Sequence, residues 1–69
     1  MRITSQGTTA TSKFHIKTYN NGWAHELTCL TTAIGLWFQD QDAAFVRDNT
    51  DNLTDEDAIT ALFTLLAYE

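Results

Sequence analysis

Three side chains in this sequence, those of His15, His25 and Cys29, carry donor atoms suited to a soft metal ion or to nucleophilic catalysis. A structural zinc site needs four such ligands, usually in pairs at short spacing, and these pairs are missing from the sequence. A nucleophilic cysteine needs a base within hydrogen-bonding distance, whereas a free cysteine is more commonly a buried apolar residue. The sequence therefore predicts no metal site and assigns Cys29 to the core.

The carboxylates are numerous, but they do not form a calcium loop. Counted from Asp48, an EF-hand needs Gly at its sixth position and Glu at its twelfth, where this sequence has Leu53 and Ile59. A chain of 69 residues also leaves little room for a catalytic pocket of roughly 300 Å3 beside its core. We therefore expect no catalytic residues, no cofactor and no enzymatic activity.

The charges are divided unevenly between the two halves of the chain. Residues 1–39 carry three cations and one anion, a net charge of +2, whereas residues 40–69 carry one cation and eight anions, a net charge of −7. Nucleic-acid binding requires basic groups that displace counterions from phosphates, and a total charge of −5 argues against it. We expect no direct contact with nucleic acid, and we expect any protein partner to be basic.

The residues after Leu53 predict a helix over about residues 55–68. Thr54 is expected to cap it, and acids in its first turn interact favourably with the positive end of the helix. The triplet that ends at Thr54 also matches a glycosylation acceptor, but we interpret it as a loop and helix cap. Apolar residues then recur at the i, i+3, i+4, i+7 spacing, which indicates a buried face made of Ile59, Leu62, Phe63 and Leu66.

Residues 13–29 predict a β-hairpin around Asn21 and Gly22, the pair most favoured in a two-residue type I′ turn. This turn places apolar side chains on one face and sets Lys17 opposite Glu26 on the other face. The predicted pairs are Asn20–Trp23, Tyr19–Ala24, Thr18–His25, Lys17–Glu26, Ile16–Leu27, His15–Thr28 and Phe14–Cys29.

An alternative is a helix that begins near Trp23, because apolar residues recur at helical spacing as far as Trp37. In that helix His25 and Cys29 would lie one turn apart and form half of a metal site. The hairpin is favoured because Asn-Gly is a poor helix interior and because several β-branched threonines follow. Whether residues 23–30 are strand or helix stays open at this point.

The remaining segments complete a single small α+β domain over residues 1–69. A helix over about residues 32–47, capped by Thr31 or Thr32 and interrupted near residues 40–42, would bury Ile34, Trp37, Phe38, Ala44 and Phe45 on one side. Residues 2–5 are a candidate third strand, and residues 6–12 are predicted to be a loop or mobile arm. The expected fold is a small antiparallel sheet with two helices packed on one face.

The expected location is the cytoplasm, or the host cytoplasm if the protein is phage-encoded. No apolar stretch approaches the roughly eighteen residues that span a membrane, so we expect no membrane association. The first residues lack the apolar core of a signal peptide, and a single cysteine forms no internal disulfide.

The function class that remains is binding to a protein surface. The acids at residues 55–57 are explained by the helix start, whereas the acids upstream have no such structural role. They either keep a small protein soluble or imitate a phosphate backbone towards a nucleic-acid-binding protein. The candidate partner-binding residues are the acids Asp40, Asp42, Asp48 and Asp51 and the aromatic residues Tyr19, Trp23 and Trp37.

In size, acidity and compactness the chain resembles in general character the inhibitors that phages use against host defence, such as anti-restriction and anti-CRISPR proteins. The resemblance implies a non-enzymatic inhibitor or regulator that occupies the nucleic-acid site of a larger basic partner. The alternative is a structural or regulatory homo-oligomer, such as a homodimer, in which the basic half of one copy meets the acidic half of another. A nucleic-acid regulator that uses Lys13, His15 and Lys17 is less compatible with the net charge.

Overall fold

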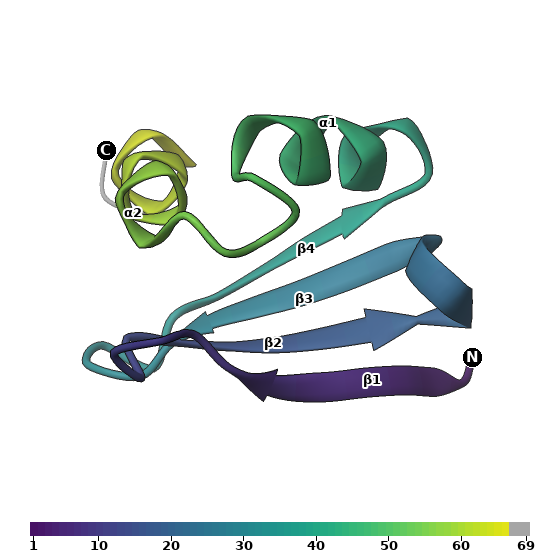
Figure 1. The fold of residues 1–69 in the computed structure, drawn as a ribbon, viewed down its shortest axis with the longest axis horizontal. Coiled ribbons are helices and arrows are strands. Elements are labelled where there is room, and N and C mark those ends of the chain that lie inside the picture. The colour runs from purple at the N-terminus through teal and green to yellow at the C-terminus, as the bar shows by residue number, and fades with distance from the viewer. Residues whose placement is uncertain (67–69) are drawn as a thin grey trace.

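The computed structural model describes residues 1–66 as a four-stranded antiparallel sheet with two helices on one side of it (Figure 1). This arrangement confirms the predicted α+β class, with four strands where two or three were expected. Strands that follow one another in the sequence are neighbours in the sheet. The elements are β1 (Ile3–Thr8), β2 (Phe14–Tyr19), β3 (Ala24–Cys29), β4 (Gly35–Gln39), α1 (Gln41–Asn49) and α2 (Glu56–Leu66).

The hairpin of β2 and β3 has six of the seven predicted pairs, from Tyr19–Ala24 to Phe14–Cys29, whereas Asn20 belongs to the turn at the tip and forms no ladder pair with Trp23. At its tip Asn21 and Gly22 both have positive φ, 58° and 110°, as a type I′ turn requires. The backbone N–H of Trp23 donates to the carbonyl of Asn20 (3.4 Å), and a short 3-10 turn, η1 (Asn20–Gly22), covers the tip. Since residues 24–29 form a strand, the alternative of a helix beginning near Trp23 is wrong.

The predicted helix over residues 32–47 is wrong in its first half, because Gly35–Gln39 forms β4 and pairs with β3. Thr31 and Thr32 therefore cap no helix. Along β4, Leu36 and Phe38 are half-buried and pack against the core, whereas Trp37 between them lies on the other face of the sheet. Asp40, with φ of 56°, separates the strand from α1 at the interruption expected near residues 40–42.

The first strand, β1, is longer than the segment expected from the sequence. It extends to Thr8, so residues 6–8 belong to the sheet rather than to the loop or arm expected over residues 6–12. The turn that follows is compact, since the N–H of Thr9 donates to the carbonyl of Phe14 (3.0 Å). The Glu56 carboxylate accepts hydrogen bonds from the hydroxyls of Thr9 and Thr11, which ties this turn to the start of α2.

The capping residue of α2 is Asp55 and not Thr54. The Asp55 carboxylate accepts the backbone N–H groups of Asp57 and Ala58, each at 3.1 Å, which is the bonding pattern of an N-cap. The Thr54 hydroxyl donates instead to the carbonyl of Asp51 (2.6 Å). The helix is described to Leu66, and the last two residues of the predicted helix lie outside the described residues.

The core lies between the helices and the facing side of β2 and β3. Cys29 is buried there, as predicted, and the ring of Phe14 stacks on that of Phe63 with 5.2 Å between centroids. Within residues 1–66, neither helix is both long and apolar enough to cross a membrane. The largest fully buried side chains are Leu27, Val46, Thr50, Ile59 and Phe63.

Candidate protein-binding surface

The helix α1 has one buried side and one exposed side. Ala43 and Val46 are fully buried, whereas Asp42, Phe45 and Asp48 are exposed. At 3.6 residues per turn, Phe45 lies at the centre of the exposed arc, with an acid three residues away in each direction. The Phe45 side chain is 59% exposed, so α1 presents an aromatic ring to solvent between two carboxylates.

Two further acids extend this surface beyond both ends of α1. Asp40 precedes the helix and Asp51 follows it, and both are exposed. The ion pair recorded within residues 1–66 joins Lys17 to Glu26 at 3.9 Å, so these acids are not neutralised by a cation in the described part of the chain. We call Asp40, Asp42, Phe45, Asp48 and Asp51 the acidic α1 surface.

The predicted aromatic residues lie elsewhere. Tyr19 and Trp37 occupy the face of the sheet away from the helices, where their ring centroids are 5.1 Å apart. The Tyr19 hydroxyl donates to Glu26 (3.4 Å), and the Trp37 indole N–H donates to the side chain of Gln39 (2.9 Å). These contacts tie both rings to the sheet, although Trp37 is still 43% exposed.

The seven residues predicted to bind a partner are therefore divided between three parts of the surface. The four acids lie along α1 and just beyond its two ends. Tyr19 and Trp37 lie on the opposite face of the sheet. Trp23 stands at the tip of the hairpin, partly exposed, and its backbone carbonyl accepts the N–H of Asp40 (2.8 Å). A partner that binds the acids on α1 does not at the same time cover the paired rings of Tyr19 and Trp37, which are tilted by 53° to each other.

The structure adds an apolar groove that the sequence did not indicate. It has a volume of about 260 Å3 and lies beside the acidic α1 surface, between β4, α1 and α2. Phe45 was expected in the core and Leu66 in the buried stripe of the last helix, but both are exposed. The feature of the sequence that could have indicated the groove is the apolar face of α2, which is wider than a single buried stripe needs to be. The groove is lined by Phe38, Asp42, Phe45, Leu62, Leu65 and Leu66.

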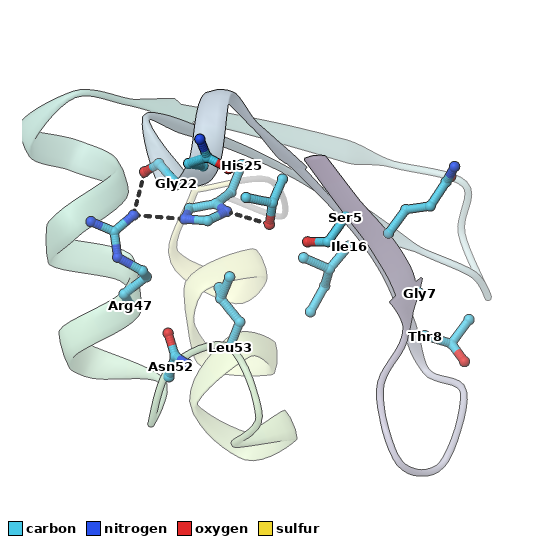
Figure 2. Close-up of a pocket in the computed structure, with 12 residues that line it drawn as sticks. Ser5, Gly7, Thr8, Ile16, Gly22, His25, Arg47, Asn52 and Leu53 are labelled. Atoms are coloured by element: carbon cyan, nitrogen blue, oxygen red, sulfur yellow. Dashed lines mark hydrogen bonds between the residues drawn. The ribbon is translucent and has the colours of Figure 1, made fainter. Parts of the chain in front are cut away.

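A polar network holds α1 against the hairpin. It lies on the side of the helix opposite the acidic α1 surface. The Arg47 guanidinium donates to the carbonyl of Gly22 and to Nε2 of His25, the latter at 2.8 Å, and Nδ1 of His25 lies 3.0 Å from the Thr18 hydroxyl (Figure 2). Because guanidinium only donates, His25 Nε2 must accept and Nδ1 must carry the proton. Burial, and then the charge of Arg47, lower the pKa of His25 below its ordinary value. His25 is therefore neutral at pH 7.

The hydrogen bonds of this network do not run in the direction that a general base at His25 would require. A general base must accept a proton from the group that it activates, but Nδ1 of His25 donates to Thr18 and its other nitrogen is occupied by Arg47. The open groove of about 430 Å3 at the network is lined by Arg47 and His25 themselves, and its other side chains, such as Ile16 and Leu53, are neutral (Figure 2). The network serves to position α1.

The described residues form neither a reactive-cysteine site nor a metal site. Cys29 is buried in the core, and no group of three or more His, Cys, Asp or Glu in the described part of the chain is arranged to hold a metal ion. Comparison of the chain with protein-family models, with curated proteins and with solved structures gives no match. Function is therefore inferred from the geometry of the described residues.

Proposed function

We propose that this protein is a non-enzymatic binding protein whose acidic α1 surface recognises a larger, basic protein partner. The observation that carries the proposal is the exposed ring of Phe45 between the carboxylates of Asp42 and Asp48. An exposed aromatic ring supplies the hydrophobic anchor of an interface, and the surrounding carboxylates attract and orient a basic surface. Asp40 and Asp51 widen the region that such a partner would contact.

A surface that only maintains solubility would not need these apolar side chains. Phe45, Leu65 and Leu66 are each more than half exposed, and all three line the groove beside the acids. Neighbouring apolar side chains with a polar rim are typical of interaction sites, whereas scattered single ones are not. The combination of acids and exposed apolar side chains therefore favours binding over solvation alone.

We further infer that the partner normally binds nucleic acid and that this protein inhibits or regulates it by occupying the basic surface. The acids of α1 and its flanks are exposed, and the half of the chain that contains them has a net charge of −7. Carboxylates at such a surface can take the place of phosphates against Lys and Arg side chains. The association should then be steered by charge and should weaken with salt.

A homo-oligomer joined through oppositely charged halves is less well supported. Of the three cations in the basic half, residues 1–39, Lys17 already faces Glu26 at 3.9 Å. Lys17 would have to leave this contact to meet the acids of a neighbouring copy. We therefore prefer a basic partner.

The test is affinity capture from host lysate at low salt, with the bound proteins identified by mass spectrometry. The D42N/D48N variant removes two charges from the acidic α1 surface, and E26Q/D57N removes two charges elsewhere. Both variants have the same net charge, so they separate a local effect from a general one. We expect the first to lose at least tenfold in affinity for the captured protein and the second to retain its affinity. Equal affinities of the two variants would reject the proposed surface.

A further inference from the structure

We propose that β4 is a docking edge, at which an extended segment of the basic partner adds to the sheet as a fifth strand. Its apolar side chains on the helix side would enter the groove between β4, α1 and α2. This inference rests on the function proposed above and deepens it by naming the conformation and side-chain pattern of the segment that binds.

The hydrogen-bond pattern leaves one side of β4 open. The N–H of Cys29 donates to the carbonyl of Ile34, and the N–H of Asp40 donates to the carbonyl of Trp23, each at 2.8 Å. In an antiparallel pair the bonded residues alternate, so the even-numbered residues between these two bonds also face β3. The backbone groups of Gly35, Trp37 and Gln39 consequently point away from β3, at the edge of the sheet.

The two edges of the sheet differ in how well they resist pairing. Proteins protect exposed edges with charged side chains, proline or a β-bulge. The β1 edge is polar for most of its length and has a register shift between Ile3 and Ser5. Strand β4 reads Gly-Leu-Trp-Phe-Gln, with none of these features. It is therefore the edge better suited to accept another strand.

The groove gives an added strand a place for its side chains. Successive side chains of a strand alternate between the two faces of the sheet. On the helix side, those of a fifth strand beside β4 would meet the groove to which Phe38, Phe45 and Leu65 contribute. On the other side they would lie beside Trp37, which is part of β4 itself. Backbone bonds would supply affinity, and the groove would select apolar residues at every second position.

Charge decides between a partner strand and a second copy of this chain. Asp40 and Asp42 lie directly after β4, and Asp42 also lines the groove. Two copies joined antiparallel along β4 would place one pair of acids at each end of the shared edge, where each pair meets a second chain with a charge of −5. A segment with Lys or Arg between its apolar residues would instead meet opposite charge. The occupant is therefore a basic, amphipathic strand of the partner.

The probe is a capped octapeptide of alternating Val and Lys, and the control peptide has Glu in place of Lys. Binding is measured by calorimetry at low salt, and protection of the amides of Gly35, Trp37 and Gln39 by hydrogen exchange. Gln39→Pro removes an N–H from the open edge without removing a β3–β4 bond. Gln6→Pro is its match on β1, since the bond from Thr9 to Phe14 sets residues 6 and 8 facing away from β2. Leu65→Ser alters the groove while leaving the sheet unchanged.

We expect the Val-Lys peptide to bind and to protect the three amides from exchange. The Gln39→Pro and Leu65→Ser variants should each bind the peptide at least tenfold more weakly than the wild type. The Gln6→Pro variant should bind it as tightly as the wild type. Binding of this peptide without amide protection, and equally in all variants, would overturn strand addition but leave the basic-partner proposal standing. Equal binding of the Val-Glu peptide at β4 would overturn the basic partner while supporting strand addition. Protection that appears without peptide, together with a dimer by light scattering, would overturn the choice of occupant.

Discussion

The Nη1 atom of Arg47 lies 2.8 Å from Nε2 of His25, and this contact joins α1 to the hairpin. The same Nη1 also donates to the carbonyl of Gly22 at the hairpin tip. Arg47 leaves the helix on the side opposite Phe45, so the network holds α1 by one side and leaves the acidic α1 surface exposed on the other. The rotation of the helix, and with it the proposed interface, depends on this contact.

Arg47→Met should destabilise the protein by about 1–3 kcal/mol, the cost of leaving a buried acceptor such as His25 Nε2 without its donor. Methionine keeps most of the apolar stem of the Arg47 side chain, so the loss of unfolding free energy measures the contribution of the hydrogen bonds. Lys17→Met is the matched control, because an exposed ion pair contributes only about 0–1 kcal/mol. Urea unfolding followed by tryptophan fluorescence measures both variants. Equal losses would mean that the Arg47 network does not support the fold.

The His25 network should make stability depend on pH. The folded-state pKa of His25 is lowered by burial and by Arg47, so below about pH 6.5, the ordinary histidine value, the unfolded chain binds a proton that the folded chain does not. The contribution of His25 to the free energy of unfolding should therefore be constant above this pH and decrease as the pH falls below about 6.5, with a slope of at most roughly 1.4 kcal/mol per pH unit.

His25→Gln should abolish this decrease, whereas His15→Gln, on the other face of the hairpin, should retain it. Urea titrations at several pH values provide the comparison. A wild-type protein whose stability does not change between pH 7 and 5 would contradict the assignment of a neutral, buried His25.

Glu56 should control the turn between β1 and β2 in a lower pH range. Hydrogen bonds from Thr9, and then from Thr11, lower the pKa of the Glu56 carboxyl, so these bonds stabilise the folded state above its ordinary pKa and are lost as the pH falls below about 4.5. Glu56→Gln should increase the amide exchange rate of Thr11 at neutral pH, because its N–H also donates to this carboxylate (3.2 Å). Asp57→Asn, the next acid along, should leave that rate unchanged.

The assignment of the α2 cap is tested by two neighbouring alanine variants. Asp55→Ala should cost about 1 kcal/mol of stability, because two backbone N–H groups in the first turn lose their acceptor. Thr54→Ala removes only a hydroxyl that bonds to Asp51 in the loop, so its cost should be smaller. Thermal unfolding of both variants decides the question. A larger loss of stability for Thr54→Ala than for Asp55→Ala would mean that Thr54, the residue expected from the sequence, caps the helix.

The hairpin could be predicted because its determinants are local. Asn21 and Gly22 adopt positive φ readily, and the alternation on either side admits one register with apolar residues on one face. Strand β4 could not be predicted in this way. The run Leu36-Trp37-Phe38 has no period that separates a strand from a helix, and its conformation is decided by pairing with β3, which is a tertiary effect.

The candidate surface was predicted only in part, for a related reason. Acids along residues 40–51 were expected to be exposed, and they are. The outward position of Phe45 depends on the rotation of α1, which is set by the buried Val46 and by the bonds from Arg47 to the hairpin. Those bonds link residues far apart in the chain, so the sequence pattern alone placed Phe45 in the core.

The affinity of Phe45→Ser for the captured basic partner tests the central claim most directly. Phe45 is largely exposed, so the variant should keep the wild-type unfolding free energy while it loses about 2 kcal/mol of binding, roughly a thirtyfold weaker affinity, as expected of an interface anchor. Leu30→Ser, at another exposed apolar residue outside the acidic α1 surface, is the matched control and should bind like the wild type. A Phe45→Ser protein that binds as tightly as Leu30→Ser would contradict recognition through this surface.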